Sequence, residues 1–144
     1  MFQFCTVQAI LYRSRVINCL ADPLEREQLA IRSADHNTSA EISGFMLYRE
    51  GQFMQYIEGE QAPLNALFSE ICNDPRHDVR VHLKQSFTAR RFPNWQMKLD
   101  PEESLDEMVL DSLWNMLTAA VLGVTTDGVW ATLDSYSRYT CLKL

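Results

Sequence analysis

The sequence predicts an α+β fold whose elements follow the order βαββαββ. Segments rich in aromatic and β-branched residues alternate apolar and polar side chains, which is typical of half-buried strands. Between them lie two segments with a proline near the start and apolar residues at helical spacing. A further long apolar stripe follows the last strand. We therefore expect a mixed sheet with both crossover helices on one face and C-terminal helices capping the other.

The first half of the chain is predicted to hold a strand, a helix and a hairpin. Residues 3–12 form the first strand. Asp22 and Pro23 then supply an N-cap and a first helical residue, and we expect this helix to run to about Asp35. The hairpin follows, with strands over 42–48 and 51–59 and a turn at Glu50-Gly51.

The second half is predicted to add a helix, two strands and a helical cap. Pro63 begins the second helix, which has one apolar face and ends at Asn73-Asp-Pro75. Strands follow over 79–87 and 95–99. Apolar residues between 105 and 121 predict a long helix, and a shorter one is predicted over 129–141. These boundaries divide the chain into a sheet-forming part, 1–99, and a C-terminal helical cap, 100–144.

Composition narrows the class of protein. The chain has 144 residues, of which 47% are hydrophobic, and this is enough for one domain with a substantial core. No apolar stretch is long enough to cross a membrane, and the N-terminus lacks the basic start of a signal peptide, so we expect a cytoplasmic protein. A formal net charge of -6 argues against a nucleic-acid or anionic-membrane surface. The cysteines form no C-x-x-C pair, so we predict mostly buried free thiols and no metal site.

One polar residue interrupts the apolar face of a predicted core strand. Strand side chains alternate between faces, so Phe53, Gln55 and Ile57 point the same way. A buried amide without a hydrogen-bond partner costs about 1–3 kcal/mol. We therefore expect Gln55 to have a dedicated partner, and the identity of that partner bears directly on function.

The ends of the first strand and first helix carry further polar candidates. Tyr12 ends a buried strand, where it is either a core tyrosine with a satisfied hydroxyl or a functional group close to Gln55. His36 and Asn37 follow the first helix. They either cap its C-terminus or bind a ligand, in which case the Asn37 amide would pair with an imide edge.

Two later motifs also have both a structural and a functional interpretation. Arg76 and His77 either form a solvated basic turn or lie near a phosphate-bearing ligand. Trp95 and Met97 share a strand face, and filling the core is the simpler interpretation. The sequence contains no Gly-rich phosphate loop, no G-x-S-x-G elbow and no set of metal-ligand spacings.

Taken together, these motifs resemble those of the BLUF domains, which are flavin-based blue-light sensors. The resemblance covers about residues 3 to 99 and depends on a set of motifs in order: Leu11-Tyr-Arg-Ser14, Asn37, Ile42-Ser-Gly44, Leu47-Tyr48, Gly51-x-Phe-x-Gln55, Glu58-Gly59, Ile71, Asp74-Pro-Arg-His77 and Arg91-Phe-x-x-Trp95-x-Met97. The C-terminal part is similar to that of short, single-domain members that end in capping helices.

The resemblance implies a ferredoxin-like sheet with FAD held between the two crossover helices. Tyr12 matches the tyrosine that donates an electron to the excited flavin. Gln55 matches the glutamine between that tyrosine and flavin N5 and O4. Asn37 matches the asparagine that hydrogen-bonds the pyrimidine edge of the ring, and His36 lies beside it.

The resemblance also assigns roles near the ring, the phosphates and the last strand. Ile71 matches an aliphatic residue that packs against the ring, and Arg76 and His77 match residues near the phosphate side. Trp95 and Met97 match a pair that exchanges positions during signalling. Two residues depart from the usual motifs: Ser43 replaces a threonine, and Gln96 replaces the serine between Trp95 and Met97.

The function implied is that of a blue-light photoreceptor and not of an enzyme. We expect the strand of Gln55 to lie beside the last strand, so that a change at Gln55 alters that strand and the helical cap passes the change to a separate partner protein. We also expect a homo-oligomer. Two alternatives stay open: a flavin-dependent oxidoreductase and a cofactor-free interaction module of the same shape.

Overall fold

The computed structural model describes residues 7–17, 23–49, 51–93, 96–99, 111–112, 114–116, 119 and 127–142. The chain forms two compact units, Met1–Asp100 and Pro101–Leu144. Within the described residues, no helix has both the length and the apolar character needed to cross a membrane.

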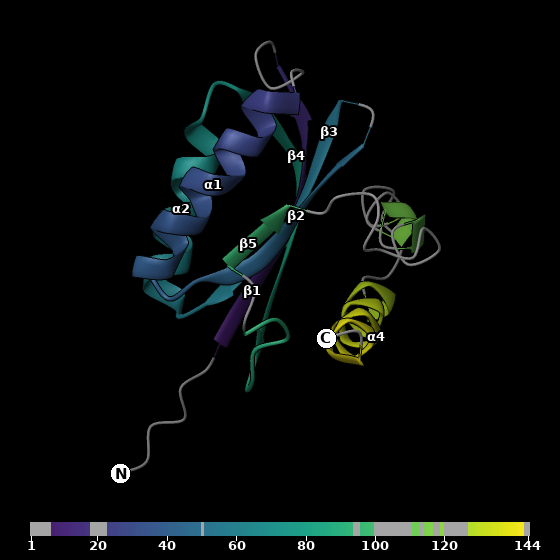
Figure 1. Cartoon of the computed structure of the whole chain (residues 1–144). Coiled ribbons are helices and arrows are strands. Elements are labelled where there is room, and N and C mark those ends of the chain that lie inside the picture. Colours follow the sequence, from purple (N-terminus) through teal and green to yellow (C-terminus); the bar gives the residue numbers. More distant parts are fainter. Residues whose placement is uncertain are drawn as a thin grey trace. The chain divides into compact units, whose positions relative to one another are not determined.

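The first unit is an α+β domain with two helices on one face of a five-stranded sheet (Figure 1). The strand order is β4-β1-β3-β2-β5, and all neighbours are antiparallel except β2 and β5. The predicted order βαββαββ and the mixed, ferredoxin-like sheet are therefore confirmed. The elements are β1 (Val7–Val16), α1 (Pro23–Ser39), β2 (Ser43–Arg49), β3 (Gln52–Gly59), α2 (Gln61–Asn73), β4 (His77–Phe87) and β5 (Gln96–Leu99).

Helix α1 ends later than the sequence predicts. We expected it to stop at about Asp35, but it continues to Ser39. The chain leaves the helix through Glu41, which has a φ of 56°, and the Ile42 N–H then donates to the Asn37 carbonyl oxygen at 2.8 Å. A left-handed residue at a helix end is usually glycine. Because a glutamate holds this position, no residue type in the sequence marks the true end of the helix.

The position of β5 differs from our expectation. We predicted that the strand of Gln55 would lie beside the last strand, which is wrong because β2 lies between β3 and β5. Strand β3 already pairs with β1 on one edge and β2 on the other, so β5 occupies the open edge of β2. Met46 is the register partner of both Gln55 in β3 and Leu99 in β5. Trp95 lies outside the described residues, as does the side chain of Met97.

Alternation along the strands gives the sheet two buried faces. The helix-facing cluster consists of Ile10, Ile42, Met46, Phe53, Ile57 and Leu64. Buried apolar side chains of the opposite face are Ala9, Leu11, Phe45, Leu47, Met54 and Tyr56. Between β2 and β3 the backbones approach closely at Gly44, where an added Cβ would lie 1.9 Å from the Tyr56 carbonyl oxygen. Only glycine fits at this point of the sheet.

The second unit contains α4 (Asp127–Leu142), which includes all residues of the last predicted helix, 129–141. Val129, Trp130 and Leu133 are its buried apolar residues. The predicted long helix over 105–121 falls largely outside the described residues, although positions 111–112, 114–116 and 119 are helical.

Candidate functional site

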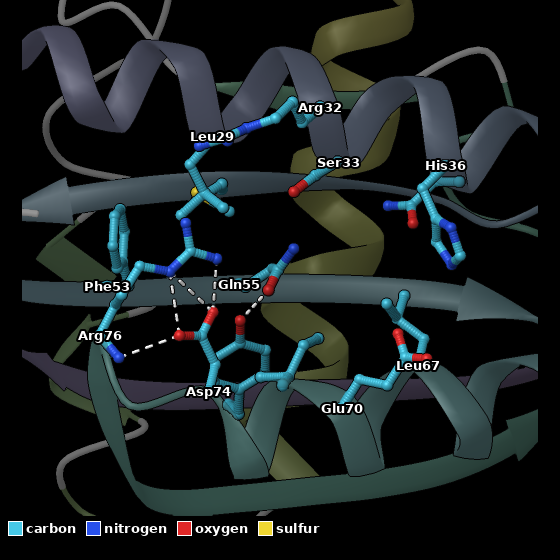
Figure 2. Close-up of a pocket in the computed structure, with 14 residues that line it drawn as sticks. Leu29, Arg32, Ser33, His36, Phe53, Gln55, Leu67, Glu70, Asp74 and Arg76 are labelled. Carbon is cyan, nitrogen blue, oxygen red and sulfur yellow. Dashed lines mark hydrogen bonds and ion pairs between the residues drawn. The ribbon is translucent and has the colours of Figure 1, made fainter.

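A pocket of about 310 Å³ lies within the first unit and is lined by α1, α2 and the helix-facing side of the sheet. This volume is at the lower end of the range for small-molecule sites. Helix α1 contributes polar side chains to one wall, and α2 contributes Leu67, Glu70 and Ile71 to the other. Figure 2 shows Gln55 in the middle of the pocket, between these walls.

Tyr12 and Gln55 form a buried hydrogen-bonded pair in the wall of this pocket. They are register partners on β1 and β3, and the Tyr12 hydroxyl donates to Gln55 Oε1 (Figure 2). Their exposed fractions are 2% and 3%. Burial, with smaller contributions from Cys72 and Asp74, raises the pKa of the Tyr12 phenol above its ordinary value of 10.0. The hydroxyl therefore stays protonated and acts as a donor, so the partner that we predicted for Gln55 includes Tyr12.

The Asn37 side chain is buried without satisfying its amide. It is 1% exposed, and neither Nδ2 nor Oδ1 has a hydrogen-bond partner among the described residues. Buried polar groups are almost always hydrogen-bonded, so such an exception indicates a missing partner. An amide that faces a pocket offers one donor and one acceptor side by side. It suits a ligand with the complementary pair, such as an imide edge.

Three of the other predicted site residues line the pocket: His36, Ile71 and Arg76. His36 is exposed and lines the pocket beside Asn37, and the partly buried Ile71 lines the α2 wall. Arg76 also lines the pocket, and its guanidinium is held by Asp74, with Nη2 at 2.6 Å from Oδ2. The side chain of His77 lies outside the described residues. Cys72 is exposed, while Cys5, Cys19 and the side chain of Cys141 lie outside the described residues, so the prediction of mostly buried thiols stays a prediction.

Sequence reasoning proposed His36 and Asn37 but missed the rest of the α1 wall of the pocket. Leu29, Arg32, Ser33 and His36 follow one another at the spacing of a single helix face, and all four line the pocket. Leu29, Arg32 and Ser33 lie inside the predicted helix, and helical spacing alone does not separate a face toward a pocket from a face toward the core. Met46 was missed for another reason, since an apolar residue in a core strand gives no functional signal.

Comparison with known proteins identifies the family. The BLUF profile, described as sensors of blue light using FAD, matches residues 7–98. The chain belongs to the BLUF family. FAD is thus the cofactor and blue light the stimulus that define its class of sensor.

Relatives and solved structures agree with this membership. The chain is 31% identical over 96 residues to the photoactivated adenylate cyclase subunit beta of Euglena gracilis, and the match covers 64% of this chain and 11% of that protein. It is 28% identical over 92 residues to the blue light- and temperature-regulated antirepressor BluF of Escherichia coli (strain K12), covering 62% and 22%. The chain therefore matches only a small part of the length of these relatives.

The fold is also that of a solved BLUF protein. The dark-state structure of BlrB has a TM-score of 0.71 and 28% sequence identity, with 99% of this chain and 100% of that chain covered. The residues of the pocket fit FAD. The unsatisfied amide of Asn37 has the donor and acceptor that would suit a pyrimidine edge, Phe53, Leu67 and Ile71 supply apolar walls, and Arg32 and Arg76 also line the pocket.

Proposed function

We propose that this chain is a blue-light photoreceptor that holds FAD in the pocket between α1 and α2 and has no enzymatic activity of its own. The observation that carries the proposal is the buried Tyr12–Gln55 pair, which faces a pocket that also contains the unsatisfied amide of Asn37. A redox-capable phenol beside a reversible amide suits a sensor, whereas the pocket offers no nicotinamide-binding fingerprint that would favour an oxidoreductase.

The residues that hold the cofactor divide by chemistry. Asn37 would pair with the pyrimidine edge, and His36 would lie beside that edge at the end of α1. Ile71 would pack against the ring. Arg76 and His77 would lie on the phosphate side, after the end of α2.

When bound, FAD supplies the absorption of blue light and accepts one electron. Tyr12 is the electron donor, and its buried hydroxyl donates a hydrogen bond to Gln55 Oε1, which can take up the proton. The Gln55 amide presents an acceptor and a donor on a nearly symmetric plane. Rotation, or passage through the imidic tautomer, reverses the two ends with little change in shape while the electron and proton return to Tyr12.

The reversed amide is the signalling state in this proposal. It changes the hydrogen bond that Gln55 offers into the pocket, and we expect the absorption band to shift to the red. One exchanged hydrogen bond contributes about 1 kcal/mol net. A difference of this size makes the reversed state metastable, so it should revert in the dark.

The register of the sheet supports a route from Gln55 to the sheet edge. Met46 in β2 lies opposite Gln55 on one side and opposite Leu99 of β5 on the other. A change at Gln55 would therefore act on β5 through Met46, and Trp95 and Met97 would respond there. In this proposal residues 1–99 sense light, while residues 100–144 pass the change to a separate protein partner, within a homo-oligomer.

Tyr12→Phe and Gln55→Leu test the proposal. Each variant should bind FAD yet show no reversible red shift after blue light, as measured by absorption spectra followed through dark recovery. Tyr56→Phe is the matched control, because it removes a buried hydroxyl from the opposite face of the sheet and should leave the shift intact. A normal shift in Tyr12→Phe or Gln55→Leu would contradict the mechanism, and rapid flavin reduction on mixing with NADH would favour an oxidoreductase.

A further inference from the structure

Two arginines line the pocket, and they differ in what holds them. The Arg76 guanidinium is occupied by Asp74, with Nε at 2.9 Å from Oδ1 and 3.1 Å from Oδ2, and Nη2 at 2.6 Å from Oδ2. The Arg76 backbone N–H also donates to Asp74 Oδ1 at 2.9 Å. Arg32 is exposed on α1, and no hydrogen bond or ion pair joins it to another described residue.

This difference determines how much charge each arginine offers to a ligand. Two donors of the Arg76 fork are satisfied by a carboxylate, so Arg76 and Asp74 together carry no net charge. Glu70 is the other acidic residue that lines the pocket, and Figure 2 places it across the pocket from Arg32, toward Leu67. Arg32 is therefore the lining cation whose charge is not already matched by a contacting carboxylate.

Arg32 also lies toward the end of the pocket that is away from the Asn37 amide. In Figure 2 it lies with Arg76 on the Phe53 side of Gln55, whereas His36 lies on the other side. The unsatisfied amide belongs to Asn37, the neighbour of His36. The pocket is thus divided into an end that offers amide hydrogen bonds and an end that offers a guanidinium charge.

We propose that Arg32 binds the phosphate groups of the cofactor and makes the pocket prefer phosphorylated flavins over riboflavin. A guanidinium presents a planar fork of N–H donors that matches phosphate oxygens. This inference rests on the proposed function, because it assigns the phosphate end of the same pocket. It gives the Asp74–Arg76 ion pair the separate task of holding the turn after α2 in place.

The test is the binding of riboflavin, FMN and FAD to the flavin-free full-length chain, followed by quenching of flavin fluorescence. Arg32→Gln should weaken FMN and FAD binding by roughly fivefold and leave riboflavin binding unchanged, since an exposed charged contact has a modest effect. Arg15→Gln, at an exposed residue of β1 that does not line the pocket, makes the same change in charge and should alter none of the three affinities. Added salt should weaken FAD binding to the parent chain more than to Arg32→Gln.

A double variant separates the two arginines. Asp74→Asn with Arg76→Gln removes the ion pair without changing the net charge, and it should lower the ratio of FAD to riboflavin affinity less than Arg32→Gln does, because no unmatched charge is lost. An unchanged ratio in Arg32→Gln, or a larger loss in the double variant than in Arg32→Gln, would overturn the inference. If Arg32→Gln leaves the ratio unchanged while the parent chain binds flavin and shows the red shift, only this inference fails; if the parent chain binds no flavin, the proposed function fails with it.

Discussion

The two faces of β3 carry buried tyrosine pairs that are alike in form and opposite in their surroundings. On the helix-facing side the Tyr12 hydroxyl donates to Gln55, and on the other side the Tyr56 hydroxyl donates to Glu58 Oε1 at 3.0 Å. Burial raises the pKa of both phenols above the ordinary value of 10.0, although Arg91 acts in the opposite direction at Tyr56. Both hydroxyls therefore stay protonated, and each donates a hydrogen bond to a side chain of β3.

On the closed side of β3, the face that carries Tyr56 and Glu58, other groups of the same chain satisfy the hydrogen-bonding capacity of the Glu58 carboxylate. Both oxygens of Glu58 accept from backbone N–H groups, at 2.8 and 2.9 Å from Arg91 and at 3.1 and 3.3 Å from Phe92. The Arg91 guanidinium donates to the Tyr56 hydroxyl at 3.2 Å and lies 4.4 Å from the centroid of the Phe87 ring. This network ties the segment before β5 to β3.

The Gln55 side is left open toward a pocket. There the side-chain amide of Asn37 has no hydrogen-bond partner among the described residues, and Asn37 lines a cavity together with Tyr12 and Gln55. A polar cluster that the chain satisfies completely stabilises the fold, whereas a cluster with unsatisfied groups beside a cavity is suited to a ligand. Burial alone does not separate the two cases, because Gln55 and Glu58 are 3% and 0% exposed.

The largest expected effect is on stability at the closed side. Glu58→Leu leaves the Arg91 and Phe92 N–H groups without their acceptor and should lower the free energy of unfolding by roughly 3 kcal/mol. Gln55→Leu removes the hydrogen bond from the Tyr12 hydroxyl and should lower the free energy of unfolding by about 1 kcal/mol. Urea unfolding of the flavin-free variants measures both. Equal losses in the two variants would show that the hydrogen bonds of Glu58 stabilise the fold no more than that of Gln55.

The next effect should have the opposite sign. Asn37→Leu replaces an unsatisfied buried amide with an apolar side chain of similar size, so the flavin-free chain should gain about 1 kcal/mol in free energy of unfolding. The same variant should bind FAD roughly tenfold more weakly, because the pyrimidine edge loses a donor and an acceptor. Urea unfolding and fluorescence titration give the two results. A loss of stability would mean that Asn37 is satisfied within the chain.

The sequence predicted the fold well because the fold depends on local patterns. Alternation in β3 and the apolar stripe of α2 are visible without any tertiary information, and the helix start at Pro23 is a local signal. The end of α1 was missed because Glu41 adopts a left-handed conformation, which is unusual for a glutamate and cannot be predicted from the residue type. The adjacency of β5 was missed because strand order depends on which edge stays open, and that is a property of the whole sheet.

The site was only partly predictable for a similar reason. Gln55 was conspicuous, since an amide among apolar neighbours contradicts the pattern of its strand. Glu58 contradicts the same pattern on the opposite face, yet its partners are backbone N–H groups from the segment before β5, which no side-chain pattern reveals. Arg32 is an ordinary exposed residue of a helix, so its place in the pocket wall became evident only from the three-dimensional structure.

The smallest expected effect is a pH dependence of stability at the closed side. Burial raises the pKa of the Glu58 carboxyl above its ordinary value of 4.5, although the backbone hydrogen bonds from Arg91 and Phe92 act against the shift. The folded chain therefore binds a proton at Glu58 more tightly than the unfolded chain does, and the free energy of unfolding should fall as the pH rises through the folded pKa. Glu58→Gln cannot titrate, so the parent chain should lose stability relative to this variant across that window. Urea unfolding at pH values from about 4.5 to neutrality measures the difference, and a constant difference would show that Glu58 has the same pKa in the folded and unfolded chain.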